Sequence, residues 1–203
     1  MFIICLFTVA VIAAVFMIEP PAEGLGYLVR IIYFHIPTAW LSVVAFFTSA
    51  FYAAKYLKTH NLTEDELSAR AAKIGFVCVI LSTISGAIFS KLTWGAYWNW
   101  DPRQTTIFVL ILIYGAYLTL RMSVTEVKTR AKVSAIYSLL SVLTVPFLVF
   151  ILPRMYFSLH PSPIINSGGL DMDSTMLAVL LAALLDATLI FVYLMRQYKN
   201  SDK

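Results

Sequence analysis

Aromatic residues gather in one short stretch of the chain, TWGAYWNWDPRQ at residues 93–104. Three of the four tryptophans fall within it, and an acid and a base follow them closely. Indole and phenol rings offer apolar faces to a flat ligand, and a neighbouring charge offers a partner for the ligand's polar edge. The residues that the stretch would contribute to such a site are Trp94, Gly95, Tyr97, Trp98, Trp100, Asp101 and Arg103.

Two backbone conformations would bring these rings together. Residues 94, 97, 98 and 101 have the spacing of one helix face, whereas an extended chain would align residues 94, 98 and 100. In both cases Gly95 leaves room for a ligand to approach closely. A belt of aromatic residues at a membrane surface is the competing interpretation, but a belt spreads its rings over many helix ends. The concentration of rings here favours a binding surface.

The residues just after the rings have the pattern of a helix start. Asp101 is a suitable N-cap, Pro102 suits the first helical position and Gln104 suits the third as a capping partner. The free N–H groups of a helix start attract carboxylates, and Arg103 can pair with a carboxylate directly. The stretch therefore combines an apolar surface with a place for an acidic edge.

The elements that must position this stretch are membrane helices. The chain has 203 residues, of which 60% are hydrophobic and 13% charged, and its mean hydropathy is +0.82. Crossing a bilayer takes about 20 apolar residues, and a crossing segment must be helical. The sequence predicts an all-α integral membrane protein with one domain over residues 1–203. Residues 2–18 lack a basic leader and a clear cleavage site, so they are expected to be a retained span. The six expected spans are residues 2–18, 36–57, 71–90, 105–120, 133–152 and 175–195. Thr63, followed three residues later by Glu66, has the pattern of a capping box, so the third helix is expected to begin inside the loop before its span.

Lysine and arginine predict the orientation of these spans. With the N-terminus in the cytoplasm, eleven of the fifteen basic residues lie on the cytoplasmic side, and only Arg30, Lys91, Arg103 and Arg154 lie outside. Cytoplasmic loops carry the excess of positive charge. Both termini are therefore expected to be cytoplasmic, with the tryptophan-rich loop, residues 91–104, on the outer side.

The same topology places two of the three histidines beside the aromatic stretch. His35 precedes the second span and His160 lies in the last outer loop, whereas His60 is on the cytoplasmic side. Heme needs axial ligands for its iron, apolar contacts along its faces and cations for its propionates. The outer side offers two histidines, the aromatic residues, and Arg103 with Lys91 and Arg154 in reserve. The sequence thus predicts heme as the ligand, with His35 and His160 as the iron ligands.

Other classes of function find little support. The net charge of +4 forms no continuous basic stripe, so nucleic-acid binding is not indicated. Cys5 and Cys78 lie in apolar runs and form no CxxC or CxxCH motif. The chain has no Walker loop, HExxH or GxSxG motif, and we assign no catalytic residue.

WGAYWNWD at residues 94–101 resembles the WGxxWxWD signature of the cytochrome c assembly family of heme-handling membrane proteins. YFHIPTAW at residues 33–40 is similar to the heme exporter protein C (CcmC) branch. The resemblance covers nearly the whole chain. It implies a protein of the bacterial inner membrane that holds heme b at the outer face, with His35 and His160 in the positions of the family's two outer histidines.

The resemblance also implies partners. Proteins of this branch pass heme to the chaperone CcmE, and work with the small membrane protein CcmD and the ABC transporter pair CcmA and CcmB. The chain is not expected to be an enzyme in the usual sense, although the resemblance leaves open that it promotes covalent attachment of heme to the chaperone. Three alternatives remain at this stage: a CcsA/ResC-type heme-handling subunit, a b-type electron-transfer cytochrome, and a small-solute transporter with an aromatic gate.

Overall fold

The structure, a computed structural model, describes residues 1–18, 25–160 and 172–201. Its regular elements are helices, as the sequence predicts. Their bounds are α1 Phe2–Met17, η1 Tyr27–Ile31, α2 Ile32–Thr59, α3 Leu62–Trp94, α4 Pro102–Ser123, α5 Val127–Pro146, the π-helical turn η2 Phe147–Ile151, α6 Leu152–Met155 and α7 Ser174–Ser201.

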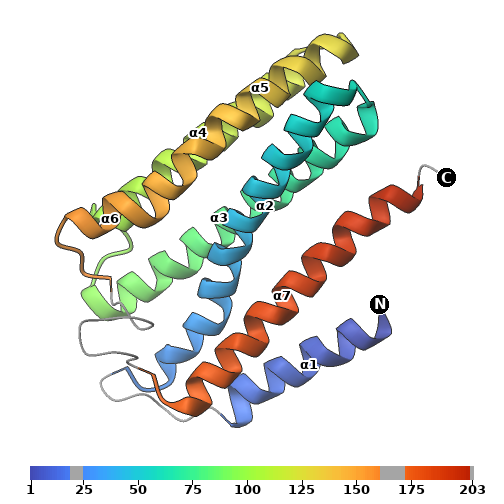
Figure 1. Cartoon of the computed structure of the whole chain (residues 1–203). Helices are drawn as coiled ribbons and strands as arrows, with labels where there is room; N and C mark the ends of the chain where they lie inside the picture. Colours follow the sequence, from blue (N-terminus) through green and yellow to red (C-terminus); the bar gives the residue numbers. More distant parts are fainter. Residues whose placement is uncertain (19–24, 161–171, 202–203) are drawn as a thin grey trace.

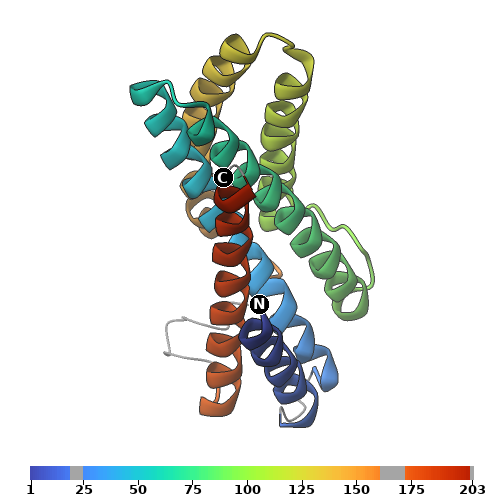
Figure 2. The same cartoon turned by 90° about the vertical axis from the view of Figure 1, so that its right-hand side faces the viewer.

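Helices α2 and α3 form the centre of the bundle (Figures 1 and 2). Helix α2 packs along α3 and also contacts α5 and α7. Helices α4 and α5 lie together on one side, and α7 with α1 lies on the other. The turns from α2 to α3 and from α4 to α5 are at one end of the bundle, and residues 95–101 are at the opposite end.

Five segments are long and apolar enough to cross a membrane. They are Tyr27–Thr59, Leu62–Trp94, Pro102–Ser123, Val127–Met155 and Ser174–Gln197. Helix α1 is also apolar but has 16 residues, about 24 Å of helix against about 30 Å of hydrocarbon. It packs against α7, where Thr8 Oγ1 lies 2.9 Å from Asp186 Oδ1. The first of the six expected spans therefore stays a prediction.

Helix α3 begins inside the loop that precedes its expected span, as the sequence predicts, but at a different cap. Asn61 is the N-cap, because its side chain accepts a hydrogen bond of 2.9 Å from the Thr63 N–H. Thr63 is thus already inside the helix. Glu66, expected to complete a capping box with Thr63, instead lies 3.1 Å from Arg121. The expected box is wrong because the neighbouring asparagine provides an equally good cap.

Two buried contacts fix α4 against the central pair. The ring of Phe46 in α2 stacks on Tyr114 in α4, with 3.5 Å between ring centres. The Arg121 guanidinium of α4 donates two hydrogen bonds, of 2.6 and 2.7 Å, to the Asp65 carboxylate of α3. This ion pair is at the end of the bundle away from residues 95–101. Together these contacts fix the position of α4 relative to α2 and α3. The loop of residues 95–101 must therefore connect α3 to α4 across a fixed separation.

Candidate functional site

The aromatic stretch begins where α3 ends. Helix α3 stops at Trp94, and Gly95 follows in the left-handed conformation with φ 82°, its N–H donating to Lys91 O at 3.1 Å. Glycine adopts this conformation without the penalty that a Cβ imposes. Residues 96–101 are not helical. The helical alternative for residues 94–101 is therefore wrong, and a positive φ of 55° at Trp100 also interrupts an extended alternation.

Three polar side chains hold the loop in shape. The Asn99 amide donates to Ser90 Oγ at 2.7 Å, and Ser90 Oγ donates to Ala96 O at 2.7 Å. The Gln104 side chain accepts a hydrogen bond of 2.8 Å from the Asn99 N–H. As a capping partner, Gln104 was expected to accept from the backbone N–H of the N-cap residue, Asp101. Its Oε1 instead accepts from Asn99, two residues before the cap. Asp101 is confirmed as the N-cap of α4, accepting from the Arg103 N–H at 2.9 Å, and Pro102 is the first helical residue.

The loop divides its aromatic rings between a cavity and the surface. Trp94 and Trp98 line the cavity described below, whereas Tyr97 and Trp100 are 61% and 72% exposed. The Trp98 ring meets Trp100 edge-on at 5.9 Å between ring centres and Phe108 at 6.1 Å. Gly95 is outside the cavity lining. The structure thus brings two of the three tryptophans of the stretch to the cavity. The third, Trp100, lies at the surface and contacts Trp98.

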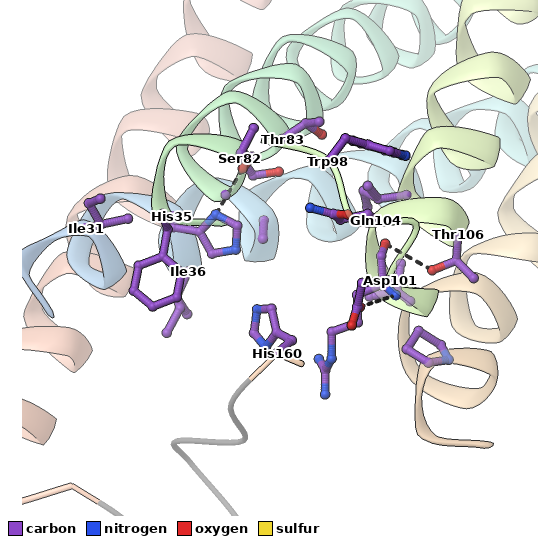
Figure 3. Close-up of a pocket in the computed structure, with 18 of the residues that line it drawn as sticks. Ile31, His35, Ile36, Ser82, Thr83, Trp98, Asp101, Gln104, Thr106 and His160 are labelled. Atoms are coloured by element: carbon purple, nitrogen blue, oxygen red, sulfur yellow. Dashed lines mark hydrogen bonds between the residues drawn. The ribbon is translucent and has the colours of Figure 1, made fainter. Parts of the chain in front are cut away.

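A cavity of about 190 Å³ opens between the ends of α2, α3 and α4 (Figure 3). Its wall is mostly apolar, and His35, Asp101, Arg103 and His160 all line it. The apolar residues include Ile31, Ile36, Ala87, Ile107, Val149 and Pro153. Residues from four separate parts of the chain therefore meet at one end of the bundle.

His35 and His160 face each other across this cavity (Figure 3). Their ring centres are 6.2 Å apart, and the rings are inclined by 39°. His35 Nδ1 lies 2.9 Å from Ser82 O and 3.1 Å from Ser85 Oγ. A carbonyl oxygen only accepts, so Nδ1 carries the proton and Nε2 keeps its lone pair. This is the form in which a histidine ligates a metal, with the other nitrogen oriented by the backbone.

Gly86 makes room for the His35 ring. A Cβ on Gly86 would lie 3.0 Å from His35 Cε1 and 3.5 Å from Nδ1. Sequence reasoning did not assign Ser82 or Gly86 to the site. Their signal was the spacing of small residues 82, 86 and 90 along one face of the third span, which marks close helix packing. That spacing indicates a contact but does not reveal that the contact is with a histidine.

Positive charge at the cavity comes from Arg103. Its Nε is buried and has no hydrogen-bond partner within the described residues. The two cations held in reserve bond elsewhere: Lys91 Nζ donates to Gly95 O at 2.8 Å, and Arg154 donates to Phe150 O at 2.7 Å. Arg103 is thus the cation placed to meet an acidic group inside the cavity.

Together, the fold and the site define a class of protein: a bundle of membrane-length helices with a histidine-paired apolar cavity at one end. The sequence profile of heme exporter protein C (CcmC) matches residues 1–201, and the chain belongs to this family. It is 29% identical over 169 residues to "Heme exporter protein C" of Bradyrhizobium diazoefficiens, a match that covers 83% of this chain and 64% of the relative.

Two further relatives are similar over shorter stretches. "Heme exporter protein C" of Rhodobacter capsulatus is 29% identical over 124 residues, which are 61% of this chain and 51% of the relative. "Cytochrome c biogenesis protein CcsA" of Prochlorococcus marinus is 45% identical over 65 residues, which are 32% of this chain and 21% of the relative. The matches thus span less than two thirds of each relative's length. The CcmC family is shown over nearly the whole chain, whereas the CcsA likeness is confined to one part.

Proposed function

We propose that this protein binds heme b as its cargo at the cavity, with His35 and His160 as axial ligands, and presents it to a heme chaperone. The observation that carries the proposal is the facing of the two histidine rings at 6.2 Å. A metal held between two imidazoles lies about 2 Å from each ligating nitrogen, and each nitrogen lies about 1.1 Å from its ring centre, so the two ring centres are about 6 Å apart. The 6.2 Å between the ring centres in the structure agrees with that distance and supports the proposal.

The rest of the cavity suits the remainder of the heme. Its isoleucine, valine and tryptophan side chains offer the apolar contacts that a porphyrin needs, and Trp98 is held at its angle by edge-on contacts. The Nε of Arg103, which has no partner among the described residues, suits a propionate, and the N-terminus of α4 lies beside it. The exposed Tyr97 and Trp100 lie on the outer surface of the loop, beyond Gly95, and would meet the chaperone or the membrane surface.

The proposed setting follows from the charge bias and the family. All six expected spans, α1 included, would cross the bacterial inner membrane among its lipids, with both termini in the cytoplasm and residues 91–104 at the periplasmic face. The receiver would be a CcmE-like chaperone. A CcmD-like small membrane protein and a CcmA/CcmB-like transporter would complete the assembly. We assign this chain the holding and presenting of heme, and no catalytic residue.

The test is an absorption spectrum of protein purified from heme-replete cells. We expect a Soret band, and a pyridine hemochrome spectrum of heme b. His35→Ala and His160→Ala should each shift the band, because each removes one axial ligand, and Trp98→Ala should lower the heme content. His60→Asn is the matched control, since His60 has a positive φ of 52° that asparagine tolerates and lies at the other end of α2. Colourless wild-type protein, or unchanged spectra in both histidine variants, would overturn the proposal.

A further inference from the structure

Asp101 makes more hydrogen bonds than a helix cap needs. Its carboxylate is buried, with the residue 6% exposed. One bond, to the Arg103 N–H, caps α4. The others reach across to the segment that carries His160: Ser158 Oγ lies 3.0 Å from Oδ1 and 2.9 Å from Oδ2, and the Leu159 N–H donates to Oδ2 at 2.7 Å.

These bonds continue to His160 itself. Ser158 Oγ accepts a hydrogen bond of 3.1 Å from the His160 N–H. The Asp101 carboxylate therefore fixes Ser158 and Leu159, and the serine hydroxyl in turn fixes the backbone of His160. Helix α6 ends at Met155, and residues 156–160 are not helical. The backbone of His35 is held by the hydrogen bonds of α2. In the non-helical segment that carries His160, the bonds to Asp101 and Ser158 have that role.

The carboxylate is poorly suited to contact the ligand directly. Both oxygens already accept from N–H or O–H donors, and a carboxylate has no proton to give to a propionate. Helix capping explains the hydrogen bond from the Arg103 N–H. It does not explain the three contacts that the carboxylate makes with Ser158 and Leu159. Those contacts join residues 57 and 58 positions apart in the sequence.

We propose that Asp101 is a positioning residue: it holds residues 158–160 at the start of α4, so that the His160 ring stays opposite His35. The inference rests on the proposed function, in which His160 ligates the heme iron. The last position of the WGxxWxWD signature thus acts on the iron through the second histidine, while the tryptophans act on the porphyrin.

Asp101→Asn separates this role from capping. Asparagine caps helices as well as aspartate does, so the bond from the Arg103 N–H is retained through the remaining oxygen. The side-chain N–H₂ replaces Oδ2, and it cannot accept from the Leu159 N–H. Ser158→Ala is a second variant that leaves the cap intact and removes the link to the His160 N–H. Asp173→Asn is the matched control, because Asp173 caps α7 through the Thr175 and Met176 N–H groups.

The first measurement uses protein freed of heme and follows hydrogen exchange in a peptide that covers residues 156–160. We expect the amides of Leu159 and His160 to exchange at least about tenfold faster in Asp101→Asn, and unchanged exchange in Asp173→Asn. The second measurement uses protein loaded with ferric heme. Asp101→Asn should turn part of the low-spin, six-coordinate spectrum into a high-spin one, imidazole should restore it, and heme affinity should fall about 10- to 100-fold.

The outcomes separate the inference from the proposed function. Unchanged exchange and an unchanged spin state in Asp101→Asn and Ser158→Ala would overturn the positioning role, even with His35→Ala and His160→Ala altering the heme spectrum. Wild-type protein that binds no heme would overturn the proposed function and the ligand role with it. In that case faster exchange in Asp101→Asn would show only that Asp101 orders the segment.

Discussion

Replacing Gly86 by alanine should weaken heme binding without weakening the fold. The new Cβ would lie 3.0 Å from His35 Cε1, whereas ordinary contact begins at 3.4 Å. The ring must therefore retreat from α3 by about 0.4 Å. Ser82 O also belongs to α3, so the bond from His35 Nδ1 would lengthen from 2.9 Å to about 3.3 Å, beyond the usual range of about 2.7–3.2 Å.

The cost follows from the role of that bond. A partner that orients a ligating histidine contributes about 10- to 100-fold to metal affinity. Heme affinity should fall by about that factor, which corresponds to about 1.4–2.7 kcal/mol. Alanine is also the better helix former, by up to about 1 kcal/mol, so the thermal stability of heme-free protein should stay level or rise. A general loss of stability cannot then explain weaker binding.

The assay is a titration of heme into heme-free protein in detergent, followed at the Soret band, with thermal unfolding measured in parallel. Gly115→Ala in α4 is the matched control, because its Cβ would meet Phe76 at 3.8 Å, an ordinary contact. This control should bind heme as the wild type does. Wild-type affinity in Gly86→Ala would refute the reasoning, since the His35 ring would then not be held against α3.

Three further predictions concern the scaffold, each read from unfolding of heme-free protein in detergent. Gly75→Ala should destabilise by about 1–3 kcal/mol, because the Cβ would lie 2.7 Å from the buried Phe46 ring; wild-type stability would show that the ring can move away freely. Arg121→Met should cost about 3–5 kcal/mol by leaving Asp65 buried without its partner, and adding Asp65→Leu should recover much of this; additive losses would contradict a coupled pair. Hydrogen bonds from Thr129 and Lys128 lower the pKa of the Glu126 carboxyl below its usual value. The stability that Glu126 contributes is therefore fully present above its unfolded-state pKa, and it is lost as the pH falls through the lower, folded-state pKa. Glu126→Gln should therefore remove part of the acid-side loss of stability, and an unchanged pH profile would rule this contribution out.

The sequence predicts which end of the bundle carries the site, because helices of membrane length place alternate loops at the same end. His35, residues 94–103 and His160 meet there for that reason. Asp101 as N-cap is also predictable, since caps depend on a few neighbouring residues. The same local reasoning misplaced the cap of α3, where Asn61 competes with Thr63 two positions away.

The contacts that orient the histidines depend on packing, which a single sequence does not encode locally. Whether Ser82 O or another carbonyl meets His35 depends on how α2 rotates against α3. Asp101 reaches Leu159 only because α4 and the end of α6 lie side by side. The division of the rings between cavity and surface likewise follows from the turn at Gly95.

A density map of the heme-loaded protein tests the central claim most directly, because it locates the iron. We predict iron between the rings of His35 and His160, with the ring centres still about 6 Å apart and the porphyrin within the apolar cavity. Iron bound by other side chains, or a porphyrin outside this cavity, would contradict the account.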